Sequence, residues 1–388
     1  MHWTYKLVAE TKGHKDSEIG YVYGKSDNCV DSIEDDQITI ASFDMDQTLI
    51  TTKSGKKFPV DENDWKWNYQ CVKDILKLYH LKGYRIIIVT NQAGIKSNEK
   101  KLNEFKQKIQ AMETCISSSH PEISFEVYCA IYKDIHRKPY PTFFENMSFD
   151  RKRSFYCGDA AGRECDHTDS DLKFAYNLRL TFRTPEYIFL NDMTSKGHLR
   201  YPIVPYSDDV LDQEKYQYIQ NSGKRPEMIL MVGLPASGKS CVTKRISEEC
   251  KINGILIDVI SLDILKSKSK MIVMIMKSAN SKNTMIIDNT NLETVTRTEL
   301  IQIVKGIEAD YYVRIVHIDT PIERCIHNNY YRYYTNYLND PKLIPDFVYM
   351  TMMKKFIIPT QQENVLIDMV ETVRPRVPLD PRYFYYFY

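Results

Sequence analysis

One glycine-rich stretch constrains the fold of the second half of this chain. The apolar run 228–232 is followed by Gly233-Leu234-Pro235-Ala236-Ser237-Gly238-Lys239-Ser240, which has the spacing GxxxxGK[ST]. Between a strand and a helix, such glycines allow backbone N–H groups to face phosphate oxygens. Lys239 is then expected to reach the β- and γ-phosphates of ATP, and Ser240 to bind Mg²⁺. The stretch therefore predicts a P-loop in a parallel α/β sheet.

Two acids follow later strands in the same half. Asp263 comes after the predicted strand 254–260, and Asp288 comes after the predicted strand 285–287. Both are expected near the ATP phosphates, because open α/β sheets bind ligands beyond the carboxyl ends of their strands. Asp263 is a candidate general base for an acceptor hydroxyl, and Asp288 is a candidate organiser of the metal. The alternative for Asp263 is the N-cap of the next helix.

The first half contains another acidic strand end. The apolar run 40–43 leads into Asp44 and Asp46, and Thr48 follows. Two carboxylates this close repel each other, and a divalent cation with oxygen ligands removes that repulsion. The spacing predicts a metal site at the carboxyl end of the strand, with an acidic turn as the alternative.

Three later residues are candidates to complete this site. Thr90 ends the predicted strand 84–89, Lys138 precedes a proline, and Asp159 lies in a turn after a further strand. A hydroxyl and a fixed lysine suit a transferring phosphoryl group, and a carboxylate suits a metal. Taken singly, the three residues also fit a helix N-cap, a solvated side chain and a turn. Their order at successive strand ends favours a phosphoryl-transfer site.

Length and composition indicate a two-domain globular protein. The 388 residues exceed one ordinary core, and 43% hydrophobic with 27% charged residues is typical of soluble proteins. A net charge of +1 argues against a general nucleic-acid coat, so a polyanion site must be a local groove. No apolar run approaches the ~20 residues of a membrane span. Nine cysteines without CxxC pairs favour an intracellular, reducing compartment, either nucleus or cytoplasm, over zinc or disulfides.

Strands alternate with helices in both halves, which predicts an α/β fold with two doubly wound parallel-sheet domains. Residues 1–184, with a short amino-terminal β extension, are assigned to the first domain and residues 227–388 to the second. The interval 185–226 contains several prolines and no sustained periodicity, which predicts a connector.

The motifs of the first half resemble a known family. Asp44-x-Asp46-x-Thr48 is similar to the first motif of the haloacid dehalogenase phosphatase superfamily, and residues 51–59 resemble its polynucleotide 3′-phosphatase branch. The chain departs from that family at Gln47, where a glycine is usual, and in a shorter segment after Arg163. The segments that resemble the later family motifs are Val89-Thr90-Asn91-Gln92-Ala93-Gly94-Ile95, Arg137-Lys138-Pro139 and Gly158-Asp159-Ala160-Ala161-Gly162-Arg163.

This resemblance implies roles for the candidate residues. Asp44 would attack phosphorus and form an aspartyl-phosphate, and Asp46 would act as general acid and then as general base. Thr90 and Lys138 would bind the phosphoryl group, while Asp171 is expected to orient Lys138 or a metal-bound water. The ligands implied for Mg²⁺ are Asp44, the backbone carbonyl of Asp46, and Asp159.

The second half resembles the polynucleotide 5′-hydroxyl kinase of the same bifunctional family. Asp263 falls on its general base, Arg332 on the lid over the ATP phosphates, and Asp288 and Arg297 on supporting positions. The resemblance spans residues 43 to 377. It implies a phosphatase/kinase that acts on DNA ends with a 3′-phosphate or a 5′-hydroxyl, with Mg²⁺ and ATP, in strand-break repair.

Two other functions remain open: healing of RNA ends, and a non-catalytic scaffold that binds DNA ends. The intact Asp44, Asp46, Lys239 and Asp263 argue against the scaffold. Animal members of the family carry an additional amino-terminal phosphopeptide-binding domain, which needs about 100 residues. Only about 40 residues precede the first motif, so that domain is expected to be absent. The sequence indicates no membrane association and identifies no protein partner.

Several aromatic residues have no assigned chemistry. Trp65 and Trp67 are candidates for base stacking, although packing is the favoured interpretation. The aromatic tail 383–388 indicates no particular role.

Overall fold

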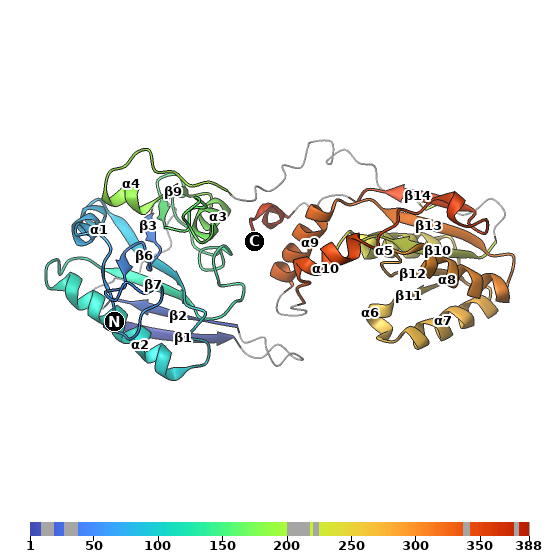
Figure 1. The fold of residues 1–388 in the computed structure, drawn as a ribbon, viewed down its shortest axis with the longest axis horizontal. Helices are drawn as coiled ribbons and strands as arrows, with labels where there is room; N and C mark the ends of the chain where they lie inside the picture. The colour runs from blue at the N-terminus through green and yellow to red at the C-terminus, as the bar shows by residue number, and fades with distance from the viewer. Residues whose placement is uncertain are drawn as a thin grey trace. The chain divides into compact units, whose positions relative to one another are not determined.

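The chain forms two compact units (Figure 1). The computed structural model describes residues 1–8, 19–26, 38–199, 218–219, 225–336, 342–375 and 380–387. The first unit contains Met1–Ile203, Asn336–Pro341 and Phe384–Tyr388, and the second contains Val204–Thr335 and Lys342–Tyr383. Most of the predicted connector 185–226 lies outside the described residues.

The boundaries of the first unit differ from the predicted limits 1–184. Helix α4 (Pro185–Phe189) begins where the connector was expected, and Phe189 is buried in the core of the first unit. At the other end of the chain, the Asn177 side chain donates to the Tyr386 carbonyl at 2.9 Å and accepts from the Tyr386 N–H at 2.6 Å. The last residues therefore pack on the first unit, although the predicted second domain, 227–388, included them.

The first unit is built on a seven-stranded sheet with the order β1-β2-β7-β6-β3-β8-β9. The strands from β7 to β9 pair in parallel, and the β1–β2 hairpin extends one edge of the sheet in antiparallel pairing. The elements of this unit are β1 (His2–Val8), β2 (Ile19–Lys25), β3 (Thr39–Phe43), β4 (Ile50–Thr51), β5 (Lys66–Trp67), α1 (Val72–Leu81), β6 (Tyr84–Asn91), α2 (Glu99–Ser117), β7 (Phe125–Ala130), β8 (Phe155–Cys157), α3 (Ser170–Asn177), β9 (Thr181–Arg183) and α4.

Helices cover both faces of this sheet. Successive side chains of a strand point to opposite faces, so one strand contributes to both cores. Phe43 of β3 packs in one core with Leu76 of α1 and Ile109 of α2. Ile40 of the same strand packs in the other core with Phe174 of α3. The first half therefore has the predicted doubly wound arrangement.

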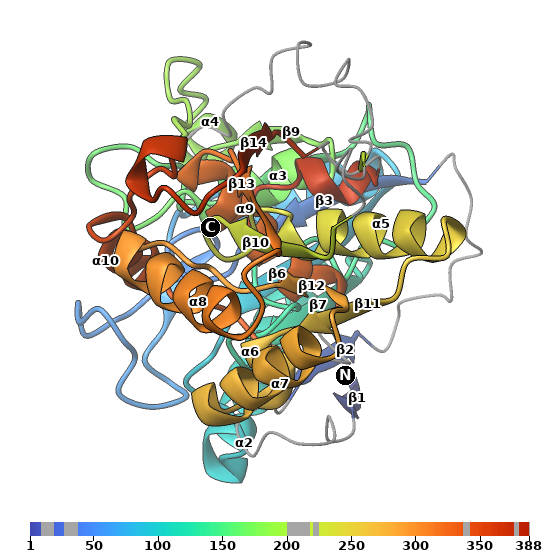
Figure 2. The same ribbon diagram turned by 90° about the vertical axis from the view of Figure 1, so that its right-hand side faces the viewer.

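The second unit has a parallel sheet with the order β11-β12-β10-β13-β14. On one face, Leu230 of β10 packs with Ile275 of α7 and Ile301 of α8. Helices α7 and α8 lie side by side in both views (Figures 1 and 2). On the opposite face, Ile229 packs with Ile246 of α5. The elements are β10 (Glu227–Val232), α5 (Lys239–Ile252), β11 (Ile257–Ile260), α6 (Leu262–Leu265), α7 (Lys268–Asn280), β12 (Thr284–Ile287), α8 (Thr294–Ile307), β13 (Tyr312–Ile318), α9 (Ile322–Thr335), α10 (Asp346–Met353), η2 (Gln361–Glu363), β14 (Met369–Val373) and η3 (Pro381–Phe384).

The predicted fold class, α/β with two doubly wound sheets, is confirmed. None of the helices in the described part of the chain combines the length and the apolar character that a membrane span needs.

Candidate active sites

The acids of the first unit lie where the strand order of its sheet reverses. From β3 the chain adds β6 and β7 on one side, and then β8 and β9 on the other. Such a reversal opens a crevice beyond the carboxyl ends of the strands. Asp44 directly follows β3, and its N–H donates to the carbonyl of Cys157, the last residue of β8, at 2.8 Å. Asp159 follows β8 two residues later, so the topology brings the two acids together.

Lys138 lies at the centre of a buried polar network. Its Nζ is 2.5 Å from Oδ1 of Asp44 and 2.8 Å from Oδ1 of Asp171. It also donates to the Val89 carbonyl at 2.9 Å and to the Tyr156 hydroxyl at 2.8 Å. With 4% of its surface exposed, Lys138 is not the solvated lysine that the sequence alone allowed. Burial lowers the pKa of Lys138, but the carboxylates of Asp171 and Asp44 outweigh burial, so the pKa lies above its ordinary value.

Asp171, near the start of α3, is held in place through both carboxylate oxygens. Oδ2 accepts the Ala160 N–H at 3.0 Å, and Oδ1 accepts the Tyr156 hydroxyl at 3.1 Å as well as contacting Lys138. The carboxylate approaches the backbone so closely that a Cβ on Gly158 would lie 2.4 Å from it. A glycine at residue 158 is therefore required for this acid to reach the lysine.

Asp46 and Thr90 are linked by Gln92. The Gln92 Nε2 donates to Oδ2 of Asp46 at 2.5 Å and to Oγ1 of Thr90 at 3.0 Å. Thr90 lies within β6 and is buried, so it is not a helix N-cap; Asn98 caps the next helix, α2. Burial raises the pKa of Asp46 above its ordinary value. A carboxyl with a raised pKa is suited to donating and accepting protons.

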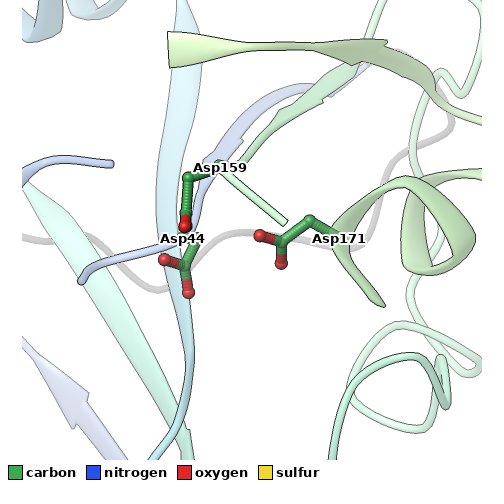
Figure 3. A group of neighbouring side chains, drawn as sticks. All are labelled: Asp44, Asp159 and Asp171. Atoms are coloured by element: carbon green, nitrogen blue, oxygen red, sulfur yellow. The ribbon is translucent and has the colours of Figure 1, made fainter. Parts of the chain in front are cut away.

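Three carboxylates of this site are close enough to share a cation. Asp44, Asp159 and Asp171 each offer an oxygen, and these oxygens lie within 4.8 Å of one another. Figure 3 shows the carboxylate of Asp171 facing those of Asp44 and Asp159. Burial, and then the charge of Asp171, raises the pKa of Asp159 to about 7, and burial raises the pKa of Asp44. A divalent cation with oxygen ligands would relieve this concentration of negative charge.

Gln47, which follows Asp44 and Asp46 and precedes β4, has a strained backbone conformation. Its φ is +61°, a left-handed conformation that costs a residue with a Cβ about 1–2 kcal/mol. The turn forms nevertheless: the Gln47 N–H donates to the Ile50 carbonyl at 2.7 Å, and Asn68 Nδ2 donates to the Gln47 carbonyl at 2.7 Å. The glycine that is usual at this position would avoid the strain, and local hydrogen bonds offset it here.

A cleft of about 480 Å³ opens onto this network. Asp44, Asp46, Thr90 and Lys138 line it together with Arg137. All the residues expected to touch a phosphoryl group in the first unit therefore face one open space.

The glycine-rich stretch of the second unit forms the predicted loop between β10 and α5. Gly238 caps α5 with φ of +105°, which a residue with a Cβ rarely adopts. Lys239 folds back over the loop, and its Nζ donates to the carbonyls of Gly233 at 3.0 Å and Leu234 at 2.6 Å. Burial, opposed by the charge of Asp288, lowers the pKa of Lys239 to about 8. Phosphate oxygens would replace these carbonyls as its partners.

Two acids of this unit, Asp263 and Asp288, lie close enough to that lysine to act on it electrostatically. Asp288 follows β12, and burial raises its pKa, although the nearby Ser240 hydroxyl and Lys239 charge lower it. Asp263 is exposed on α6 and is close enough to Lys239 and Asp288 to act on them electrostatically. The N-cap of α6 is Ser261, so the N-cap interpretation of Asp263 is wrong.

The two arginines differ in their surroundings. Arg332 is exposed on α9, and its charge acts on Lys239. Arg297 is fully buried: its Nε donates to Oε1 of Glu363 at 2.7 Å, and its Nη1 donates to the carbonyls of Asn291 and Leu292 at 2.9 Å and 3.0 Å. Arg297 therefore stabilises the loop after β12 by hydrogen bonds to two of its carbonyls.

This burial predicts a large effect of Arg297→Ala on stability. The change leaves Glu363 as a buried charge without its partner, which typically costs about 3–5 kcal/mol. The three tryptophans, Trp3, Trp65 and Trp67, all lie in the first unit, so tryptophan fluorescence reports the unfolding of that unit alone. On heating Arg297→Ala, we expect a transition in far-ultraviolet circular dichroism at a lower temperature than in the wild type. The fluorescence should show no transition at that temperature. Adding Glu363→Gln should restore part of the loss, and a wild-type transition in Arg297→Ala would contradict the support role.

Several side chains of the polar network around Lys138 were not among the predicted site residues. They are Tyr156, Gln92 and Asn91. Asn91 binds the backbone of Lys138: its Oδ1 accepts the Lys138 N–H at 2.9 Å, and its Nδ2 donates to the Lys138 carbonyl at 3.3 Å. Asn91 and Gln92 stand beside Thr90 at the end of β6, and that placement was the available signal. For Tyr156, in the apolar strand β8, the sequence offered none.

Trp65 and Trp67 pack rather than stand free for stacking. Their rings lie 5.4 Å apart in an edge-on arrangement, both pack against the main core of the first unit, and the Trp67 Nε1 donates to the Cys115 sulfur at 3.4 Å. The favoured packing interpretation is confirmed.

Both halves match known protein families. Residues 39–189 match a family model described as polynucleotide kinase 3 phosphatase, and residues 228–359 match a model described as an AAA domain. The bifunctional polynucleotide phosphatase/kinase of Schizosaccharomyces pombe is 32% identical over 338 residues, which cover 83% of this chain and 77% of that protein. A putative bifunctional polynucleotide phosphatase/kinase of Acanthamoeba polyphaga mimivirus is 30% identical over 87% of this chain and 85% of that protein.

The first unit alone also has relatives. The polynucleotide 3′-phosphatase of Saccharomyces cerevisiae is 26% identical over 41% of this chain and 91% of that protein. The two family models together span both sets of strand-end residues in one chain. This chain therefore belongs to the family of bifunctional polynucleotide phosphatase/kinases.

Proposed function

We propose that this chain prepares broken DNA strands for joining, by removing 3′-phosphates in the first unit and phosphorylating 5′-hydroxyls with ATP in the second. The observation that carries the proposal is the presence of two sites in one chain. One is the buried Asp44–Lys138 pair where the strand order of the first sheet reverses, and the other is a P-loop lysine with two acids nearby in the second unit.

In the first unit, Asp44 is the nucleophile. Its carboxylate oxygen forms a bond to phosphorus, while the bond from phosphorus to the 3′-oxygen breaks and that oxygen takes a proton from Asp46. Asp46 then accepts a proton from the water that hydrolyses the aspartyl-phosphate. Lys138 and Thr90 hold the phosphoryl oxygens, and Asp171 keeps Lys138 charged and aimed at Asp44.

In the second unit, Lys239 and Arg332 hold the phosphates of ATP. Asp263 takes the proton from the 5′-hydroxyl as the hydroxyl oxygen attacks the γ-phosphorus and ADP leaves. The exposure of Asp263 beside the P-loop supports this role, since a substrate strand must reach the base.

Mg²⁺ is the cation we propose for both sites. The close carboxylates of Asp44 and Asp159 fit it in the first unit, with the Asp46 carbonyl, and Ser240 with Asp288 fits it in the second. When bound, Mg²⁺ would neutralise charge on the phosphoryl oxygens.

Removal of the metal should therefore stop both reactions. We expect excess EDTA to reduce 3′-phosphate release and 5′-phosphorylation to background, because the carboxylates of each site then repel the incoming phosphate. Added Mg²⁺ beyond the chelator should restore both, whereas equal Ca²⁺ should not, since its looser geometry suits phosphoryl transfer poorly. Full 3′-phosphate release in EDTA would contradict the proposed site.

RNA ends are the second candidate substrate, because the chemistry at phosphorus is the same. An end-labelling assay with matched DNA and RNA oligonucleotides, each with a 3′-phosphate or a 5′-hydroxyl, decides between them. A DNA-repair role predicts higher kcat/KM on DNA for both reactions. Higher kcat/KM on RNA would favour RNA healing, and no reaction on either would favour a binding scaffold.

An intracellular, reducing location is part of the proposal. The cysteines within the described residues are free thiols, which supports it.

A further inference from the structure

Tyr383, in the aromatic tail to which the sequence assigned no chemistry, is fully buried in the second unit. It lies in η3 and packs edge-on against two rings of α9, with centroid distances of 4.8 Å to His327 and 5.2 Å to Tyr331. Its backbone carbonyl is 2.5 Å from Nε2 of His327. Because a carbonyl only accepts, that nitrogen carries the proton. The backbone and the ring of Tyr383 are therefore both held by α9.

The hydroxyl of Tyr383 is linked to the P-loop through one side chain. It donates to Oδ1 of Asn328 at 2.5 Å, and Nδ2 of Asn328 donates to the carbonyl of Ala236 at 2.8 Å. Since the Ala236 carbonyl can only accept, the amide nitrogen of Asn328 must face it. Tyr383 satisfies the opposite end of the amide and so holds the Asn328 side chain at this position.

Ala236 is a position where the P-loop needs such support. Its φ is +55°, a left-handed conformation that is unfavourable for a residue with a Cβ. In a planar trans peptide, the C=O of one residue and the N–H of the next point in opposite directions. Asn328 therefore fixes the Ala236–Ser237 peptide, whose N–H donates to the Leu234 carbonyl at 3.2 Å. Thr320, whose hydroxyl donates to the Ser237 carbonyl at 2.8 Å, sets the direction of the Gly238 N–H.

We propose that Tyr383 is a positioning residue for ATP: through Asn328 it fixes the Ala236–Ser237 peptide and so holds the P-loop in the conformation that receives the phosphates. The proposal rests on the kinase function proposed for the second unit. It assigns to the carboxy-terminal tail a part in nucleotide binding, while the chemistry at the 5′-hydroxyl is left to residues that Tyr383 does not touch.

The link from the Tyr383 hydroxyl through Asn328 to the Ala236 carbonyl is called the relay below. Tyr383→Phe tests it, because this change removes the hydroxyl and keeps the ring. Loss of one orienting hydrogen bond should raise the KM for ATP, and the dissociation constant of ATP in calorimetry without oligonucleotide, about three- to tenfold. The KM for the 5′-hydroxyl oligonucleotide, the 3′-phosphatase rate and the melting temperature should stay near wild type. Tyr331→Phe is the matched control: it removes a neighbouring hydroxyl that donates to Asp380 at 3.0 Å, and it should leave ATP binding unchanged.

A double-mutant cycle separates a relay from two independent effects. Asn328→Ala should weaken ATP binding at least as much as Tyr383→Phe, and adding Tyr383→Phe to it should have little further effect. Wild-type ATP affinity in Tyr383→Phe, a lowered melting temperature with unchanged ATP affinity, or fully additive losses would each overturn the relay. Wild-type protein that binds ATP but phosphorylates no 5′-hydroxyl would instead count against the kinase function, since the calorimetric arm does not depend on turnover.

Discussion

Asp44→Asn is expected to reduce release of phosphate from a 3′-phosphorylated oligonucleotide to background, a loss on the order of 10³-fold or more, while 5′-phosphorylation continues. The change keeps the shape of the side chain and an oxygen that can accept from Lys138, which lies 2.5 Å from the present carboxylate. It removes the negative charge and hence the proposed nucleophile. Release of inorganic phosphate and transfer of γ-labelled phosphate, measured on the same preparation, check both parts.

Lys239→Ala supplies the reciprocal control. This lysine is buried in the P-loop, and its loss removes the charge proposed to hold the ATP phosphates. We expect 5′-phosphorylation to be lost with the 3′-phosphatase intact. If either folded variant lost both activities, the interpretation of two separate sites would be wrong.

The second large effect is expected from Asp263→Asn. Removal of a general base typically lowers turnover by about 10²- to 10⁴-fold. Because Asp263 is exposed on α6 and Ser261 is the N-cap, little stability should be lost, and the affinity for ATP should change little. Single-turnover phosphorylation at saturating ATP, together with the melting temperature, separates a chemical role from a structural one.

Asp258→Asn is a matched control for that variant. Asp258 lies on the strand that leads to Asp263, and its Oδ2 accepts from Ser278 at 2.7 Å and from Asn283 at 3.1 Å. The same chemical change there should affect packing between β11 and α7 and leave turnover near wild type. Near-normal turnover in Asp263→Asn would remove this residue from the mechanism and make Asp288 the next acid to test.

The sequence predicted the positions of the acids well, because parallel strands place their carboxyl ends at one edge. Asp44 and Asp159 could be grouped from the sequence alone, although the strands that they follow are far apart in the sequence. The fold class followed from the same alternation of strands and helices. Local patterns therefore predicted most of the fold and brought the candidate residues to the correct sheet edges.

The supporting residues could not be predicted in the same way, because their partners are set by tertiary packing. Tyr156 reads as an apolar strand residue, yet its hydroxyl joins Lys138 to Asp171. Arg297 matched a family position, but its burial against Glu363 depends on a turn distant in the chain. Tyr383 lies in a tail without periodicity, and only the packing of η3 on α9 reveals its link to Asn328.

The domain limits were missed for a related reason. Helix α4 is short and follows a proline, so the sequence read as connector, whereas the burial of Phe189 fastens it to the first unit. The last residues join the first unit through hydrogen bonds of Asn177, which sequence spacing does not indicate.

The most direct test of two end-processing sites in one chain is mass spectrometry of a nicked DNA duplex that carries a 3′-phosphate and a 5′-hydroxyl at the nick. With ATP and Mg²⁺, the strand upstream of the nick should lose the mass of one phosphate and the downstream strand should gain it. Without ATP, only the loss should occur. A folded protein that changes neither strand, or that changes only one end in the presence of ATP, would contradict the account.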